Sequence, residues 1–120
     1  MDKEDIVEWA SKTVVPEWTT GAHHAPNAMC FYDADLFPSE FKGDAFVAFH
    51  GSWNRSTKGG YAVTRVLFED GHPYGELKMV NFLGPDQEVN GRPVDVIVAP
   101  DGSLLISDDY KNRIYRLSPE

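Results

Sequence analysis

The chain has 120 residues and a mass of 13.5 kDa, and 42% of its residues are hydrophobic, which suffices for one modest domain and excludes a larger multidomain protein. Nineteen acidic and eleven basic side chains give a formal net charge of -8 and a pI near 4.8, which argues against binding to nucleic acid or anionic lipid. Apolar runs such as residues 45–49 are far shorter than the roughly twenty residues that cross a bilayer, so no membrane insertion is expected.

A short helix is expected over residues 1–15. Asp2 and Asp5 suit its first turn, where carboxylates favour the exposed N–H groups, and Pro16 stops it. Apolar side chains recur at helical spacing at Ile6, Ala10 and Val14. We assign residues 1–16 to an N-terminal helical segment or linker, and they lack the basic start and apolar run of a secretory signal peptide.

Residues 17–120 are expected to form β-structure, because short apolar runs alternate with clusters of Gly, Pro, Asn and Asp. Most connections are too short to hold a helix, so neighbouring strands are expected to be antiparallel and joined by hairpins. The predicted strands cover residues 28–32, 45–50, 61–68, 78–83, 94–99, 103–107 and 113–117.

An internal repeat divides these strands into two units. The aligned segments are 25–31 with 92–98, 43–50 with 102–109, and Asn54-Arg55 with Asn112-Arg113. Each unit contains a strand after X-Pro, a Gly turn, a second strand, an Asn-Arg loop and a third, more polar strand, which is typical of a β-propeller blade. Two units fill only part of a propeller ring, so we expect exposed apolar residues on their flanking faces.

Three loops next to the innermost strands are expected to meet at the mouth of the central channel, where propellers bind ligands. These loops are residues 21–26, 50–55 and 89–93, and they supply imidazoles, an indole and two guanidinium groups. Arginine binds carboxylates through two hydrogen bonds, and an indole stacks on flat rings. This set of side chains therefore suits a planar, anionic ligand.

Four segments of the chain resemble the glucose/sorbosone dehydrogenase family over roughly residues 17–118. They are residues 23–29 (HHAPNAM), 46–55 (FVAFHGSWNR), 91–96 (GRPVDV) and 101–109 (DGSLLISDD). The HGSWNR stretch is the more specific signal, since the last segment occurs across many six-bladed propellers. The resemblance implies an all-β, partial six-bladed β-propeller of about two to three antiparallel blades with a short N-terminal helix, in which residues 17–120 are the C-terminal blades.

The resemblance also implies a cofactor and residues that hold it. Family members bind pyrroloquinoline quinone (PQQ), with calcium, and oxidise sugars or sugar aldehydes. By position, Arg92 is expected to bind the cofactor carboxylates, Arg55 to add a cationic contact and His23 to face the cofactor. Trp53 is expected either to stack on the cofactor or to fill space between blades. The family's catalytic base and calcium ligands belong to earlier blades, so neither a catalytic residue nor a metal ligand is assigned here.

The remaining histidines have structural interpretations beside functional ones. His24 points away from His23 along an extended chain and is expected to support the loop. His50 either completes a strand end or contacts the ligand. His72, in an Asp-Gly-His-Pro sequence, is expected to lie in a turn without a functional role.

The acidic residues near the loops are also open to two interpretations. Asp108 and Asp109 look like a metal-binding pair, but an acidic residue here is expected to accept hydrogen bonds from loop backbone. Asp95 follows an inner-strand start and is expected to pair with Arg92 or Arg55, or to support them from behind.

We therefore expect the chain to contribute one side of the quinone-binding mouth of a PQQ-dependent sugar dehydrogenase. Two alternatives stay open: a non-catalytic binding or assembly module, with three copies closing a six-bladed ring, and a calcium-dependent lactonase-type propeller. Expected partners are a sugar or sugar-aldehyde substrate, an electron acceptor, and the missing blades or oligomer partners. The resemblance implies a periplasmic or secreted location.

Overall fold

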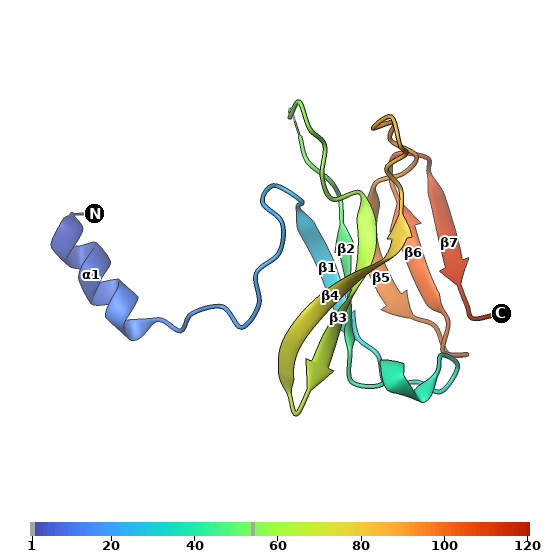
Figure 1. Ribbon diagram of the computed structural model, residues 1–120, viewed down its shortest axis with the longest axis horizontal. Coiled ribbons are helices and arrows are strands. Elements are labelled where there is room, and N and C mark those ends of the chain that lie inside the picture. Colours follow the sequence, from blue (N-terminus) through green and yellow to red (C-terminus); the bar gives the residue numbers. More distant parts are fainter. Residues whose placement is uncertain (1, 54) are drawn as a thin grey trace.

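A computed structural model describes residues 2–53 and 55–120, so Asn54 of the predicted repeat lies outside the described residues. Within them the chain forms one helix and two small antiparallel sheets (Figure 1). The elements are α1 (Lys3–Lys12), β1 (Pro26–Phe31), the 3-10 turn η1 (Ser39–Phe41), β2 (Ala45–Phe49), β3 (Ala62–Glu69), β4 (His72–Asn81), β5 (Pro93–Val98), β6 (Leu104–Asp108) and β7 (Arg113–Leu117). The predicted all-β architecture with a short N-terminal helix is confirmed.

The strands form two meanders in chain order. The first blade has the order β1-β2-β3-β4 and the second β5-β6-β7, with every neighbouring pair antiparallel. All seven predicted strands are present, but β4 begins at His72 rather than at residue 78. The reason is a two-residue hairpin, because Asp70 and Gly71 both take positive φ (50° and 79°), so that Glu69 pairs with His72. The placement of His72 in a turn was therefore wrong.

Helix α1 has a complete N-terminal cap. The Asp2 side chain accepts from the Asp5 N–H at 2.9 Å, and the Asp5 carboxylate accepts from the Asp2 N–H in return. The helix ends at Lys12, earlier than expected, because Thr13 is already extended. None of its residues is buried, and it stands apart from the sheets (Figure 1). No helix of the described residues is long and apolar enough to cross a membrane.

The internal repeat is visible in the backbone of the two blades. β1 and β5 both begin at a proline, and both show a register shift against their partner strand directly after it. The turns that follow both contain a glycine with positive φ, Gly43 at 87° and Gly102 at 93°. The predicted alignment of these segments is confirmed where the structure describes them.

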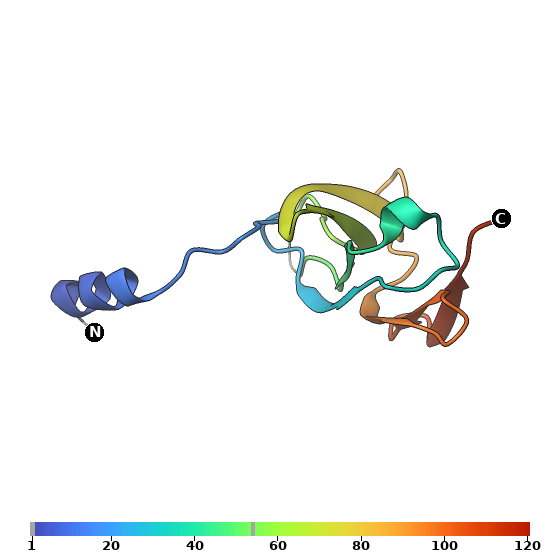
Figure 2. The ribbon, with the colours of Figure 1, turned by 90° about the horizontal axis from the view of Figure 1, so that it is seen from below.

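The core lies between the two sheets (Figure 2). Its central residues are Tyr32, Phe37, Phe46, Ala48, Tyr61, Val63, Phe82, Val96, Leu104 and Ile106. β1 and β2 of the first blade contact β5 of the second, so the inner strands lie side by side. This packing fixes the ends of both blades relative to each other.

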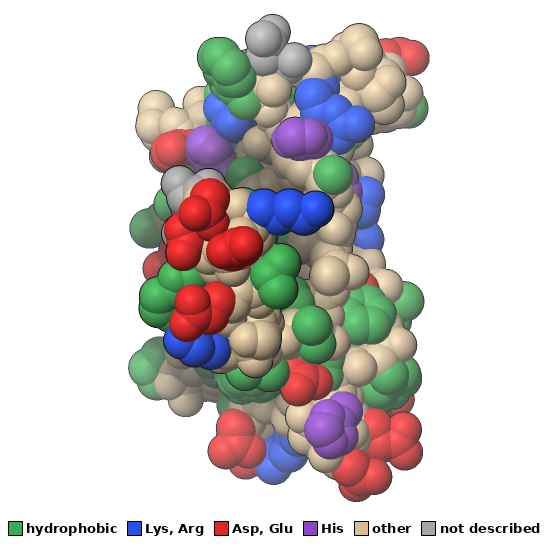
Figure 3. Space-filling view, turned by 90° about the vertical axis from the view of Figure 1, so that its left-hand side faces the viewer, with side chains coloured by type: hydrophobic (Ala, Val, Ile, Leu, Met, Phe, Trp, Pro, Cys, Tyr) green, Lys and Arg blue, Asp and Glu red, His purple; other side chains and the backbone are tan. Residues whose placement is uncertain are grey.

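Apolar side chains also lie on the outward faces of the blades. Met29 and Phe31 of β1 are 55% and 57% exposed, and Ile97 of β5 and Ile114 of β7 are 49% and 74% exposed. Figure 3 looks from the side of α1 and shows hydrophobic side chains on that face, among acidic ones and among lysine, arginine and histidine side chains that lie at the top, at mid-height and near the bottom. The predicted exposure of the flanking faces is confirmed.

Candidate functional site

Four loops converge at one end of the two sheets, and we call this end the mouth. The loops are residues 20–25 before β1, 50–61 after β2, 84–92 before β5 and 109–112 after β6 (Figure 1). Antiparallel strands alternate direction, so the entry to a first strand and the exit from a second lie at the same end. The pairing order of the sheets therefore brings these four segments together.

Tyr61 forms a buried aromatic base beneath the 50–61 loop. Its side chain is 5% exposed, and its hydroxyl donates to the Ser52 carbonyl oxygen at 2.6 Å. A Cβ at Gly51 would lie 2.6 Å from the Tyr61 ring, so only glycine leaves room for the aromatic ring there. Tyr61 itself has a left-handed backbone with φ of 53°, which directs the chain from the loop into β3.

Above Tyr61 is a hollow with a cationic lining. It is lined by Ser52, Arg55, Ser56, Lys58 and Tyr61. Arg55 Nη1 donates to the Ala22 carbonyl oxygen at 3.1 Å, and Lys58 Nζ donates to the Gln87 carbonyl oxygen at 2.9 Å. These two contacts tie the 50–61 loop to the loops on either side. Cations gather here although the whole chain carries a formal charge of -8, so the mouth differs in sign from the overall charge.

Arg92 approaches Tyr61 from the second blade. Its guanidinium carbon lies 5.7 Å from the centre of the Tyr61 ring, and its Nε donates to the His50 carbonyl oxygen at 3.2 Å. Within the described residues its two terminal amino groups make no hydrogen bond. Arg92 and Arg55 therefore lie about the same aromatic ring, and the outer fork of Arg92 is available to a ligand.

Asp108 fixes the backbone that carries Arg92. Its Oδ1 accepts from the N–H groups of Arg92 (2.9 Å), Tyr110 (2.9 Å) and Lys111 (3.2 Å), and its Oδ2 accepts from the Tyr115 hydroxyl. Burial raises the pKa of Asp108, but these donors together outweigh it and hold the pKa below its ordinary value. The prediction that this residue binds loop backbone is confirmed.

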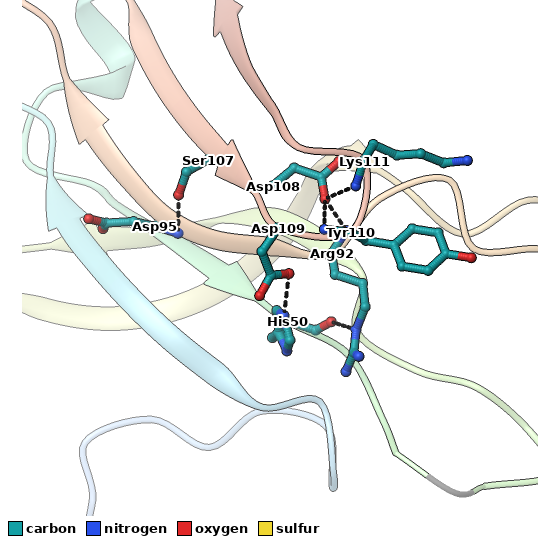
Figure 4. Close-up of polar contacts among 8 residues, drawn as sticks. All are labelled: His50, Arg92, Asp95, Ser107, Asp108, Asp109, Tyr110 and Lys111. Carbon is teal, nitrogen blue, oxygen red and sulfur yellow. Dashed lines mark hydrogen bonds and ion pairs between the residues drawn. The ribbon is translucent and has the colours of Figure 1, made fainter.

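His50 and Asp109 form a polar contact between the blades (Figure 4). His50 Nε2 lies 2.9 Å from Asp109 Oδ1, and the His50 N–H donates to the Ala25 carbonyl oxygen at 2.9 Å. Within the part of the chain that the structure describes, Asp108 accepts from loop backbone, whereas the Asp109 carboxylate contacts an imidazole of the other blade.

His23 and His24 have different surroundings in the loop before β1. His23 is exposed and has a left-handed backbone with φ of 62°. The His24 ring packs edge-on against Phe49 at 5.9 Å, and a Cβ at Gly21 or Gly59 would lie within 2.4 Å of it. Burial, followed by the nearby Arg55 and Lys78 charges, lowers the pKa of His24. The supporting role predicted for His24 is confirmed.

The predicted pairing of Asp95 differs from the structure, and one of the two interpretations of Trp53 is not found between these blades. The Asp95 carboxylate accepts from the Val96 N–H at 2.8 Å and, among the described residues, forms no ion pair with Arg92 or Arg55. The Asp95 side chain points away from Arg92 (Figure 4). Trp53 is 81% exposed and so does not fill space between these two blades.

Lys58 and Tyr61 were not predicted as residues of the mouth, and Asp109 was not predicted to contact His50. A Gly59-Gly60 pair directly before Tyr61 was the available signal, since it marks a close backbone approach. Nothing local to Lys58 or Asp109 indicates their partners, which come from distant loops.

The described residues contain no group of three or more His, Cys, Asp or Glu side chains placed to hold a metal ion. No calcium ligand set is therefore assigned to the described part of this chain, and the lactonase-type alternative gains no support from it.

The chain is similar to known proteins over most of its length. The family model described as TrAA12-like matches residues 7–120. An uncharacterized protein of Borreliella burgdorferi is 41% identical over 100 residues, which are 80% of this chain and 26% of that protein.

Solved structures show the same fold over part of their length. The holo form of the pyranose dehydrogenase PQQ domain from Coprinopsis cinerea matches with a TM-score of 0.66 and 24% identity over 81% of this chain and 27% of that one. The calcium structure of Trichoderma reesei carbohydrate-active enzymes family AA12 gives a TM-score of 0.60 and 25% identity over 82% and 25%. A glucose dehydrogenase gives 0.67 and 20% over 92% and 30%. The chain thus spans less than a third of each relative, and the predicted partial β-propeller is confirmed.

Proposed function

Because this chain belongs to the TrAA12-like family, we propose that it forms one side of the quinone-binding mouth of a PQQ-dependent sugar dehydrogenase. The observation that carries the proposal is the placement of Arg55, Lys58 and Arg92 around Tyr61 at the loop end of two propeller blades. The identification of a sugar dehydrogenase family from the four sequence motifs agrees with the family match.

The chemistry of this donor set fits a flat anion that carries carboxylates. Arg92 offers two terminal amino groups in one plane, which suits bidentate carboxylate binding. Arg55 and Lys58 add positive charge, and Ser52 and Ser56 add hydroxyl groups at the same hollow. The Trp53 indole is exposed on the adjoining loop and offers an aromatic surface for stacking.

The residues of this chain would bind and orient the cofactor rather than transfer the proton. PQQ, when bound, supplies the electrophilic quinone carbon that accepts hydride from the sugar. Arg92 and Arg55 would neutralise carboxylates, and His23 would face the ligand from the exposed turn before β1. The catalytic base, the calcium site and most sugar contacts would come from other blades.

Equilibrium titration of the chain with PQQ tests this function. We expect saturable binding that Arg92→Ala weakens by about tenfold, and that Arg92→Lys restores only in part, because lysine keeps the charge but not the fork. Arg116→Ala is the matched control, since Arg116 pairs with Asp101 at the opposite end of the second blade. Equal affinities of the Arg92→Ala and Arg116→Ala variants would contradict the proposal.

A turnover assay separates binding from catalysis. The chain is expected to reduce no dye when it is supplied with PQQ, calcium, a panel of aldoses and an electron-accepting dye. The reason is that the family's catalytic base belongs to earlier blades. Robust reduction would show that the chain holds the complete catalytic set. A periplasmic or secreted location is part of the proposal and rests on the family resemblance.

A second candidate is an assembly module without catalysis, in which further copies or other blades cover the flanking faces. The observation in its favour is the exposure of Met29, Phe31, Ile97 and Ile114 on both outer faces. Light scattering distinguishes the two, since a mass of three protomers favours ring closure and a monomer counts against it.

A further inference from the structure

His50 touches three of the four loops of the mouth. Its N–H donates to the Ala25 carbonyl oxygen, its carbonyl oxygen accepts from Arg92 Nε, and its imidazole meets the Asp109 carboxylate. The three distances are 2.9, 3.2 and 2.9 Å. A single residue at the end of β2 thus joins the loop before β1, the loop before β5 and the loop after β6 (Figure 4).

The imidazole contact is partly shielded from solvent. The His50 side chain is 22% exposed and the Asp109 side chain 60% exposed. The contact operates with a neutral imidazole, whose Nε2–H donates to the carboxylate, and with the imidazolium. It therefore holds the end of β2 against the second blade.

Asp108 and Asp109 act on Arg92 from two directions. Asp108 accepts from the Arg92 N–H and so fixes the Arg92 backbone. Asp109 contacts the His50 imidazole, and the His50 carbonyl oxygen accepts from the Arg92 side chain. Asp108 is the last residue of β6, and Asp109 follows it directly in the chain. The Arg92 side chain is therefore clamped at Nε, and its outer amino groups extend beyond the clamp.

We propose that His50 and Asp109 are positioning residues that set the direction of the Arg92 guanidinium through the His50 carbonyl oxygen. The consequence for the ligand rests on the proposed function, in which Arg92 binds carboxylates. The position of Arg92 itself does not depend on that function. Losing the Asp109 contact frees the His50 loop, and the acceptor for Arg92 Nε moves with it.

Nuclear magnetic resonance of the ¹⁵N-labelled chain tests the positioning without any ligand. The Arg92 Nε–H is expected to exchange with solvent at least about threefold faster in Asp109→Ala than in the wild type, because its acceptor is no longer held. Asp109→Asn keeps an acceptor oxygen and is expected to restore slow exchange. Asp35→Ala, which breaks an exposed ion pair with Lys42, is the matched control and is expected to leave the exchange rate of the Arg92 Nε–H unchanged. Unchanged exchange in Asp109→Ala overturns the proposal.

PQQ titration then tests the consequence for the ligand by a double-mutant cycle. Asp109→Ala is expected to weaken binding by about fivefold in the wild type but to have no further effect in Arg92→Ala, because it acts through Arg92. An equal loss in both backgrounds overturns the positioning role. If the wild-type chain does not bind PQQ, the proposed function fails, and the exchange rates alone decide whether His50 and Asp109 position Arg92.

Discussion

Tyr32 of the first blade donates its hydroxyl to the Gly102 carbonyl oxygen of the second blade at 2.7 Å, across seventy positions of sequence (|i−j| = 70). The same hydroxyl accepts from the Phe37 N–H at 3.0 Å, and the ring is fully buried. One side chain thus joins the blades at the end opposite the mouth, as His50 does within it.

Replacing Tyr32 with Phe is expected to destabilise the chain by about 1–3 kcal/mol, because two buried backbone groups lose their partner. Urea denaturation measures the change. Tyr74→Phe is the control, since Tyr74 is 59% exposed, and it is expected to change the free energy of unfolding by less than about 0.5 kcal/mol. Similar effects of both substitutions would show that the interblade hydrogen bond contributes little.

Gly60 and Gly43 provide a matched pair of glycines with nearly equal φ, 84° and 87°. A Cβ at Gly60 would lie 2.7 Å from the His24 carbonyl oxygen and 2.9 Å from Gly51 Cα, whereas none of these contacts exists at Gly43. Gly43→Ala is expected to cost about 1 kcal/mol from backbone strain, and Gly60→Ala about 1–3 kcal/mol more from the clash. Thermal unfolding of the two variants measures the difference, and equal costs would contradict the close approach of the loops.

Asp108 is expected to make the stability of the chain depend on pH below about 5. Its pKa is lower in the folded state than its ordinary value, so its contribution is present at neutral pH and is lost as the pH falls towards the folded pKa. Asp108→Asn is expected to reduce this loss. The measurement is the free energy of unfolding at several pH values between about 3 and 7. Ser103 and Arg116 also lower the pKa of Asp101. Asp101 is present in both the wild type and the Asp108→Asn variant, so its contribution to the pH dependence cancels in the comparison. Parallel pH curves would contradict the role of Asp108.

His24 is expected to titrate below about pH 6.5, because burial lowers its pKa and the Arg55 and Lys78 charges lower it further. Arg55→Gln is expected to raise the midpoint, whereas Arg116→Gln, at the far end of the second blade, is expected to leave it unchanged. The imidazole proton resonances measure both. A midpoint that does not respond to Arg55→Gln would show that Arg55 is not held near His24 in solution.

The sequence predicted most of the fold because the signals for strands and turns are local. Proline starts β1 and β5, and Gly43 and Gly102 mark the turns after them, so the two units could be aligned by residue type. The start of β4 was missed because the whole Asp-Gly-His-Pro sequence was assigned to a turn, whereas Asp70-Gly71 alone forms the hairpin turn and pairing begins at His72. Turn geometry outweighed composition there.

The candidate site was only partly predictable. The motifs indicated Arg55, Arg92 and His23, and the structure places both arginines about Tyr61. The assignment of these residues and Trp53 to cofactor binding stays a prediction. The expected pairing of Asp95 with an arginine was wrong, since the Asp95 carboxylate accepts from the Val96 N–H instead.

The seven strands, their antiparallel pairing and the two repeated units were predictable from the residues alone, since strands and tight turns depend on neighbours in the chain. The contacts of Asp109 with His50, of Lys58 with Gln87 and of Arg92 with Tyr61 emerge from the three-dimensional arrangement of the loops. These partners come from loops that are distant in sequence, and their distances are set by how the buried faces of the two sheets pack. That packing depends on many apolar side chains together, so no local pattern of residues encodes it.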